Sequence, residues 1–300
     1  MNSRNISIVW DFDGTLTPDD STSKVIEYFK GHGKEQDFWS MIKKIGQSGY
    51  TDKKDWEHVL ASDAPTWMYS LSQIAYASKT PLNTEFFKKL KNQVTLFKNV
   101  EVFLKELKSL ETTADFKKLN ISVHHFIVSA GIKDYVELLV PENLFTWVWG
   151  CRYAVIINEK DTHGESPESV PVFCMDETMK TRSLFEITKG TFLDSKKEVN
   201  HKVESEKLWC HFENLIYIGD GPTDVPALSL VRDRGGMGVV VYNKNKPTAD
   251  IKKRLGQMSA DKRCDLITAA DYSLNGELYL ALKTKCIQIQ QKIAAEKIEI

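Results

Sequence analysis

The chain has 300 residues, of which 42% are hydrophobic and 10% aromatic, and its formal net charge is −1. This length allows one large or two modest domains with a proper apolar core. The near-neutral charge gives no electrostatic case for nucleic acid or an anionic membrane as a partner, and no apolar run approaches the ~18 residues of a membrane-spanning helix.

The five cysteines lie far apart and form no CxxC pair. This spacing indicates neither a zinc site nor a disulfide framework, and a reducing setting fits it best. The first residues, MNSRNISIVW, contain no long apolar core of a secretion signal and no glycine at position 2 for myristoylation. We therefore expect a cytoplasmic protein without a membrane or nucleic-acid partner.

The first predicted element is a short buried strand over residues 6–10, which runs directly into the sequence DFDGTLT. Asp11 and Asp13 are two positions apart, and Gly14 lets the backbone turn. Two carboxylates at the carboxyl end of a buried strand are costly unless a cation meets them. The pattern predicts a divalent-cation site with Asp11 as ligand and nucleophile and Asp13 as proton carrier. An Asp-rich turn that only caps the next segment is the alternative.

Residues 18–95 show no strand-like run and much helical periodicity. Glycines and Pro81 divide the segment into predicted helices, over residues 21–29, 36–45, 53–61, 66–77 and 84–94. The segment has its own aromatic content, including Trp39 and Trp67, which we interpret as packing residues. It reads as a helical bundle inserted between the first strand and the rest of the chain.

The α/β pattern resumes near residue 99. An amphipathic helix is predicted over 101–110, with Val102, Phe103, Leu107 and Leu110 on one side, followed by a polar connection. A strand over 122–128 is expected to end at Ser129, and the chain then turns through Gly131 into a helix. A strand, a hydroxyl residue, a glycine and a helix start together form a good phosphate seat. Ser129 could also be the N-cap of that helix, and the two interpretations are compatible.

Residues 144–176 cannot be assigned from pattern, although 145–149 and 153–157 are apolar enough for strands and 159–170 reads as a loop. The next predicted helix begins near Thr178 or Thr181 and is stopped by Gly190. Lys180 lies at its start and Lys189 at its end.

The sequence NLIYIGDGPTDVPAL is a second strong signal. A buried strand over 215–218 leads into a tight glycine turn around Asp220, and Asp224 follows four positions later. Further strands are predicted over 238–242 and 265–268. The tail is predicted to be helical from about residue 277, and its apolar side is expected to be Leu278, Leu282, Ile287 and Ile289.

These motifs resemble those of the haloacid dehalogenase superfamily. Its phosphatases carry the motif Asp-x-Asp-Gly-Thr-x-Thr, and every fixed position is matched, by Asp11, Asp13, Gly14, Thr15 and Thr17. The order along the chain is also matched: a hydroxyl residue closing a strand, a lysine at a helix start, and Gly-Asp-Gly-x-x-Asp. The helical segment after the first motif is most similar to the phosphoserine phosphatase branch of the superfamily.

The resemblance implies an α/β fold: a Rossmann-like core of residues 1–17 and 96–300 with a mostly parallel sheet, and an α-helical cap of residues 18–95. Sites in such sheets form at the carboxyl ends of the strands. Asp19 and Asp20 would then lie near the substrate, where they could meet a cationic group or serve as a solvated loop or helix cap.

The resemblance further implies residue roles, with Mg²⁺ as the cofactor. The expected metal ligands are Asp11, the backbone carbonyl of Asp13 and Asp220, with Asp224 as a further ligand or as a carboxylate just outside the direct ligands. Ser129, Ala130, Gly131 and Lys180 would bind the phosphoryl group, with Lys189 as the rival for the lysine of the third motif.

The implied activity is Mg²⁺-dependent hydrolysis of a small phosphorylated metabolite through an aspartyl-phosphate intermediate. A phosphotransferase that uses the same intermediate and a non-catalytic binding or regulatory protein are the alternatives. The substrate and the oligomeric state stay open.

Overall fold

The computed structural model describes residues 4–48, 63–156, 167–194, 196–246 and 249–296. Its centre is a seven-stranded sheet in the order β4-β3-β2-β1-β5-β6-β7. The strands are β1 (Asn5–Trp10), β2 (Ser122–Ile132), β3 (Phe145–Ile156), β4 (Glu168–Phe173), β5 (Leu215–Gly219), β6 (Met237–Tyr242) and β7 (Leu266–Ala269). All neighbouring pairs are parallel except β3 and β4. The predicted α/β fold with a mostly parallel sheet is confirmed.

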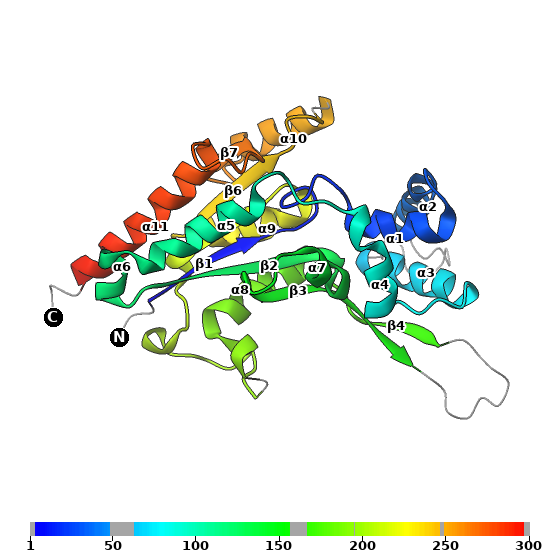
Figure 1. Ribbon diagram of the computed structural model, residues 1–300, viewed down its shortest axis with the longest axis horizontal. Coiled ribbons are helices and arrows are strands. Elements are labelled where there is room, and N and C mark those ends of the chain that lie inside the picture. The colour runs from blue at the N-terminus through cyan, green and yellow to red at the C-terminus, as the bar shows by residue number, and fades with distance from the viewer. Residues whose placement is uncertain (1–3, 49–62, 157–166, 195, 247–248, 297–300) are drawn as a thin grey trace.

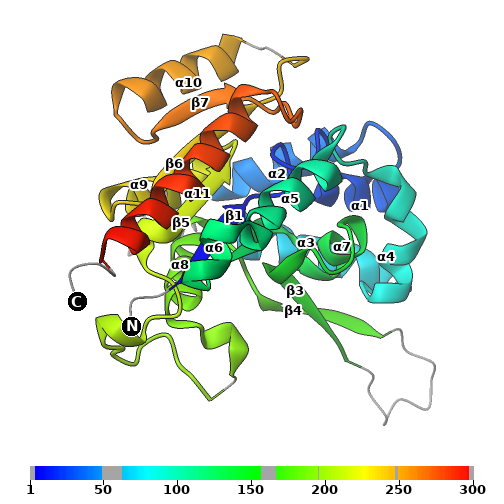
Figure 2. The same cartoon turned by 60° about the vertical axis from the view of Figure 1, so that its left-hand side comes forward.

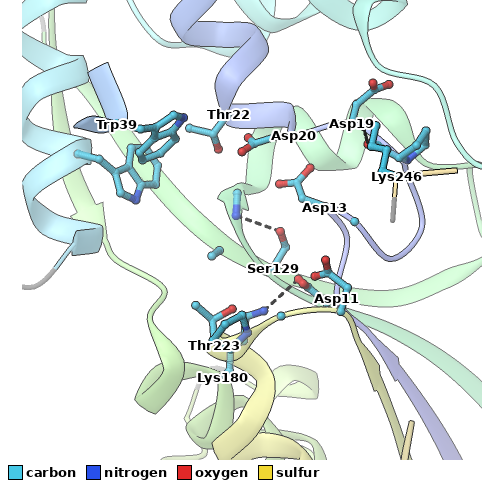
Figure 3. Close-up of a pocket in the computed structure, with 18 residues that line it drawn as sticks. Asp11, Asp13, Asp19, Asp20, Thr22, Trp39, Ser129, Lys180, Thr223 and Lys246 are labelled. Atoms are coloured by element: carbon cyan, nitrogen blue, oxygen red, sulfur yellow. Dashed lines mark hydrogen bonds and ion pairs between the residues drawn. The ribbon is translucent and has the colours of Figure 1, made fainter. Parts of the chain in front are cut away.

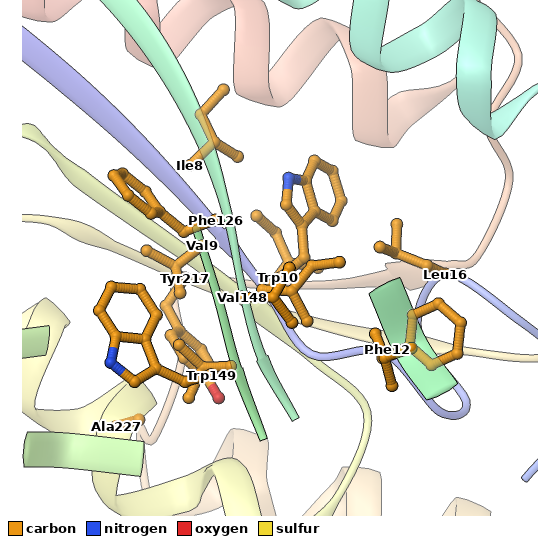
Figure 4. Close-up of a cluster of buried hydrophobic side chains, with 14 of the residues drawn as sticks. Ile8, Val9, Trp10, Phe12, Leu16, Phe126, Val148, Trp149, Tyr217 and Ala227 are labelled. Atoms are coloured by element: carbon orange, nitrogen blue, oxygen red, sulfur yellow. The ribbon is translucent and has the colours of Figure 1, made fainter. Parts of the chain in front are cut away.

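Strand β1 lies at the centre of the sheet, paired with β2 on one side and β5 on the other. Residues 6–10 are fully buried because helices cover both faces of the sheet, which is why the strand reads as an apolar run rather than an alternation. Ile8 and Trp10 project to one face and Val9 to the other (Figure 4). Trp10 pairs in register with Ile127 and with Ile218, so β1 and β5 end near the same level, beside the part of β2 that leads to Ser129.

The helices lie on both faces of the sheet and at one end of it (Figures 1 and 2). They are α1 (Ser21–Lys30), α2 (Glu35–Ser48), α3 (Asp63–Ala77), α4 (Thr84–Leu90), α5 (Val100–Ser109), α6 (Ala114–Leu119), α7 (Lys133–Leu139), α8 (Glu177–Lys189), α9 (Val225–Asp233), α10 (Ala249–Ala260) and α11 (Glu277–Glu296). On one face, the ring of Phe103 in α5 lies 6.1 Å from that of Trp10 and 5.5 Å from that of Tyr279 in α11. Helices α8 and α9 contact each other on the opposite face.

Helices α1 to α4 gather at the end of the sheet where β1 terminates (Figure 1). Helix α1 begins after Asp20, whose side chain accepts a hydrogen bond from the backbone N–H of Ser23. Asn83 caps α4 in the same way, through the N–H of Phe86. The helix predicted over 53–61 lies outside the described residues. Within the described ranges, no helix combines the length and hydropathy needed to cross a bilayer.

Strands β3 and β4 form an antiparallel hairpin in the region that the sequence pattern left unassigned. The end of the loop predicted over 159–170 belongs to β4. The hairpin reaches the helical group: the Tyr153 hydroxyl donates to the carbonyl of Met68 in α3 at 2.9 Å. The backbone N–H of Leu82 donates to Ser169 Oγ at 2.8 Å, and both bonds are buried. The hairpin therefore fastens the helices to the sheet.

Strand β2 and helices α6 and α10 differ from the sequence-based expectations. Strand β2 continues to Ile132 instead of ending at Ser129. Helix α6 occupies the predicted polar connection, which its short length and weak apolar periodicity explain. Helix α10 has no counterpart among the predicted elements.

Two apolar positions point away from the core. Val102 is 51% exposed because the buried stripe of α5 runs through Val100, Phe103, Leu104 and Leu107. Ile287 is 36% exposed because α11 buries Leu282, Cys286, Ile289 and Ile293 instead. The buried residues of α5 follow the i, i+3, i+4, i+7 spacing, and those of α11 recur in steps of four, three and four residues, so each set lies on one face of its helix.

Candidate active site

Carboxylates from two strand ends meet at one edge of the sheet. Asp11 directly follows β1, Asp220 follows β5, and Asp224 lies in the short helical turn Pro222–Asp224. One carboxylate oxygen from each of the three lies within 4.8 Å of the others. This is a separation that a single cation can bridge. The parallel pairing of β1 with β5 explains the convergence of groups about 200 residues apart in the chain.

Lys180 lies in the first turn of α8, which is capped by Asp176. Its fully buried ammonium group is 3.0 Å from Asp11 Oδ1 and 2.7 Å from Asp224 Oδ1. Burial lowers the pKa of Lys180, but the two carboxylates outweigh burial and raise it above its usual value, so the side chain stays charged. The rival Lys189 instead donates to the backbone carbonyls of Val199 and His201.

Asp224 is fully buried, and both of its carboxylate oxygens accept hydrogen bonds. Oδ1 accepts from Lys180 and from the Tyr217 hydroxyl, each at 2.7 Å, and Oδ2 accepts from the N–H of Gly221 at 3.1 Å. This arrangement favours Asp224 as the residue that orients Lys180. Sequence reasoning missed Tyr217. The available signal was a phenol in an otherwise aliphatic strand, since a buried tyrosine hydroxyl usually needs a partner.

Asp11 is buried among negative charges that Lys180 alone does not balance. Burial raises the pKa of the Asp11 carboxyl to about 8, the charge of Asp224 adds to the effect, and Lys180 opposes it. A second positive charge would relieve this repulsion. Carboxylate oxygens are hard ligands, so the donor set fits a hard divalent cation.

The raised pKa of Asp11 predicts a pH-dependent stability of the metal-free protein. Between about pH 4 and pH 8, folded Asp11 holds a proton that the unfolded chain has lost, so stability falls as the pH rises, by at most about 1.4 kcal/mol per unit. Asp11→Asn removes this dependence. In the presence of a chelator, the Asp11→Asn protein should melt at a higher temperature than the wild type, and this difference should grow from pH 4 to pH 8. A pH-independent difference would contradict the assignment.

Asp13 faces the first turn of α1. Ser21 donates twice to it, through its N–H to Oδ1 at 2.8 Å and through its hydroxyl to Oδ2 at 2.9 Å. Burial and the neighbouring charge of Asp20 raise the pKa of Asp13 well above its usual value, which suits a carboxyl group that must deliver a proton. Sequence reasoning did not identify Ser21, because only the fold shows that α1 begins beside Asp13.

Ser129 lies within β2 and has its side chain at the site. Its Oγ accepts a hydrogen bond from the N–H of Gly131 at 2.9 Å. The N-cap role predicted for Ser129 is wrong, because Ile132 precedes the first turn of α7. Gly131 is needed here, since a Cβ at this position would lie 3.0 Å from Asp13 Oδ2 and from Ser21 Oγ.

The backbone at Gly14 lies directly against the Asp220 carboxylate. It has φ +74°, and an added Cβ would lie 2.3 Å from Asp220 Oδ2. We expect Gly14→Ala to displace this carboxylate and to weaken divalent-cation binding about tenfold or more, measured by thermal stabilisation in a Mg²⁺ titration. Gly33→Ala is the control, because Gly33 has φ +78° and an added Cβ would meet nothing within 4 Å. Equal effects of the two changes would rule out a specific role for Gly14.

The acidic site opens into a cavity of about 460 Å³ (Figure 3). Ser129, Ala130 and Gly131 line it beside Asp11 and Asp13. Figure 3 shows that Trp39 and Thr22 lie across the cavity from Asp11 and Lys180. The cavity is also lined by Asp19, Asp20, Trp67, Asp220 and Lys246.

Two tryptophans of the helical segment both pack and line the cavity. Trp67 belongs to the hydrophobic core and Trp39 packs against it, as predicted, and both also border the cavity. Apolar residues of a bundle look the same in sequence whether they face a core or a cavity. Asp20 is a helix cap, as one of the two alternatives held, and it also lines the cavity.

No family model matches the chain. An uncharacterized protein of Borreliella burgdorferi is 23% identical over 243 residues, which are 78% of this chain and 81% of that protein.

Three solved structures share the architecture. Apo phosphoserine phosphatase is 15% identical with a TM-score of 0.50, over 90% of this chain and 96% of that one. A substrate-bound phosphoserine phosphatase complex is 13% identical with a TM-score of 0.50, over 91% and 96%. A probable phosphoserine phosphatase from Vibrio cholerae, unliganded, is 11% identical with a TM-score of 0.55, over 96% and 67%. The chain has the fold of these phosphoserine phosphatases, which agrees with the fold implied by the motifs. At these identities the similarity shows the fold alone.

Proposed function

We propose that the protein is a Mg²⁺-dependent phosphatase that hydrolyses a small phosphorylated metabolite. The observation that supports this most is the buried ammonium of Lys180, held between Asp11 and Asp224 beside the cavity. This arrangement keeps a carboxylate and a positive charge together where a phosphoryl group would arrive. The similar solved structures are phosphoserine phosphatases, which agrees with this class of reaction.

In the proposed reaction, a carboxylate oxygen of Asp11 attacks phosphorus in line with the ester bond. The P–O bond to the alcohol breaks, and the leaving oxygen takes the proton of Asp13. The product of this step is an aspartyl-phosphate on Asp11. Asp13, now ionised, then accepts a proton from the water that attacks this phosphorus, and inorganic phosphate and free Asp11 result.

Other residues would bind the phosphoryl group. The Lys180 ammonium would offset its charge. The Ser129 hydroxyl already accepts from Gly131, so its own hydrogen can be donated to a phosphoryl oxygen. Mg²⁺ would be held by Asp11, Asp220, the backbone carbonyl of Asp13 and, directly or through water, Asp224. When bound, it would supply positive charge that lowers the cost of the transferring phosphoryl group.

The domain division proposed with this function has two parts. Residues 1–17 and 96–300 would be the catalytic core. Residues 18–95, with α1 to α4, would be a cap that covers the site and excludes water.

The experiment that tests the proposal is hydrolysis of p-nitrophenyl phosphate by the purified protein. Turnover should require Mg²⁺ and should disappear in excess chelator. Repeating the assay with a high concentration of an acceptor alcohol separates the alternatives, because a phosphotransferase would form a new phosphoester in place of inorganic phosphate. Absence of any Mg²⁺-dependent turnover on a panel of phosphorylated metabolites would favour a non-catalytic protein.

Asp13→Asn should slow the release of the alcohol in a single turnover of an alkyl phosphate by about 10²–10⁴-fold, because the amide has no acidic proton to give. Rapid-quench measurement of the alcohol checks this. Asp19→Asn is the matched control, since Asp19 also lines the cavity but accepts from the backbone N–H of Thr95. Full retention of the rate in Asp13→Asn would remove its acid role.

A further inference from the structure

The cavity wall opposite the acidic site contains an aromatic corner, formed by Trp39 of α2 and Trp67 of α3. The two ring centroids are 6.3 Å apart and the ring planes are inclined by 68°. Trp67 is only 5% exposed. The indole N–H of Trp39 donates to Ser23 Oγ at 2.9 Å, which fixes the ring. The rings therefore form two sides of a box instead of a parallel stack.

A carboxylate is fixed beside this aromatic corner. Asp20 lies next to Thr22 on the cavity wall (Figure 3). Its Oδ1 accepts from the N–H of Ser23 at 2.8 Å. The same serine thus orients both the Trp39 ring and the Asp20 carboxylate. The part of the cavity that would receive the leaving group is both aromatic and acidic.

Few of the described residues that line this cavity are basic. Among the described residues that line it, the basic ones are Lys180 and Lys246. Lys180 is engaged by Asp11 and Asp224 at the opposite end. Lys246 donates to the backbone carbonyl of Pro18 at 2.9 Å. A substrate carboxylate, such as that of phosphoserine, would face Asp20 and the tryptophans without a described cationic partner on that wall.

Indole faces bind cations, best of all alkylated ammonium groups, which are weakly hydrated. A nearby carboxylate adds Coulomb attraction. We propose that the preferred substrates are phosphoesters of alcohols that carry an alkylated, positively charged nitrogen and no carboxylate. Trp39, Trp67 and Asp20 are the specificity-determining residues. This inference rests on the proposed phosphatase function and specifies its substrate class.

The kinetic test compares kcat/KM for phosphocholine, thiamine monophosphate, O-phosphoserine and glycerol 3-phosphate in Mg²⁺. Phosphocholine or thiamine monophosphate should exceed the other two by about tenfold or more. The preferred one of the pair distinguishes an aliphatic from a heteroaromatic cation. A preference for O-phosphoserine or for glycerol 3-phosphate would overturn the inference and would leave the phosphatase function intact.

Single substitutions test which residues determine the substrate preference. Trp39→Leu should lower kcat/KM for the preferred cationic substrate about tenfold and leave that for glycerol 3-phosphate nearly unchanged. The charge of Asp20 also raises the pKa of Asp13, so for Asp20→Asn the readout is the ratio of the two kcat/KM values, which should fall about tenfold. Asparagine keeps the helix cap and removes only the charge. Trp147→Leu is the control, because Trp147 is 41% exposed on β3 and does not line this cavity. Equal losses on both substrates would overturn the assignment of specificity.

A binding measurement separates this inference from the proposed function. Calorimetric titration of the Asp11→Asn protein with phosphocholine and with thiamine monophosphate needs no turnover. Binding that Trp39→Leu weakens would support the cation site even if the protein hydrolyses nothing. If neither compound binds more tightly than glycerol 3-phosphate, the inference is wrong, whatever the outcome of the p-nitrophenyl phosphate assay.

Discussion

Asp11→Asn should abolish Mg²⁺-dependent hydrolysis of p-nitrophenyl phosphate, with a loss of about 10⁴-fold or more in kcat. The amide is nearly the same size as the carboxylate and can still accept from Lys180 through Oδ1, so the local packing should survive. It cannot form the acyl-phosphate bond, and it contributes no charge to a cation. Steady-state kinetics with a melting curve for each protein provide the measurement.

The control for this variant is Asp134→Asn. Asp134 pairs with Arg152 at 3.8 Å and does not line the cavity. Its activity should match that of the wild type. Retention of more than a few per cent of activity in Asp11→Asn, with an unchanged Mg²⁺ requirement, would show that another group attacks phosphorus.

Lys180→Met should reduce both activity and stability. The substitution leaves Asp11 and Asp224 buried without their shared cation, and removal of one partner of a buried ion pair typically costs about 3–5 kcal/mol. Loss of the positive charge at the phosphoryl group should lower kcat about 10²–10³-fold. Urea denaturation in chelator and in Mg²⁺ measures the first effect, and Mg²⁺ should restore part of the lost stability.

Lys189→Met decides between the two lysines considered for this role. The ammonium of Lys189 donates to the backbone carbonyls of Val199 and His201. Removing this group should therefore destabilise that segment and leave kcat near the wild-type value. A larger loss of kcat in Lys189→Met than in Lys180→Met would reverse the assignment.

The strand ends were the most predictable part of the molecule. A buried apolar run that stops at an aspartate and a glycine has few alternatives, and both Asp11 and Asp220 follow strands that the sequence pattern indicated. Parallel pairing then brings the two together. Lys180 was harder to identify, because nothing adjacent in sequence distinguishes it from Lys189. Its partners lie about 170 residues before it and about 40 residues after it in the chain.

The rest depended on tertiary contacts that leave no local signal. Ser129 follows an apolar run and precedes a glycine, a pattern that is also typical of a helix cap, but β2 continues past it. Trp39 and Trp67 occupy positions that would equally suit a bundle core. The hairpin of β3 and β4 was not assigned, because its partner on the helical side, α3, is distant in the chain.

The attachment of that hairpin limits how the helical group can move. The chain enters the helical group between β1 and α1 and leaves it between α4 and α5. These two connections are adjacent, because the Phe97 N–H donates to the Leu16 carbonyl and the Thr17 hydroxyl donates to the Thr95 carbonyl. Two adjacent connections alone would act as a single pivot. The hydrogen bond that Tyr153 donates to Met68 and the one that Ser169 accepts from Leu82 add a further anchor, on the hairpin. A rigid rotation of α1–α4 away from the sheet must therefore break both bonds or bend β3, where the pairing with β4 shifts register between residues 152 and 153.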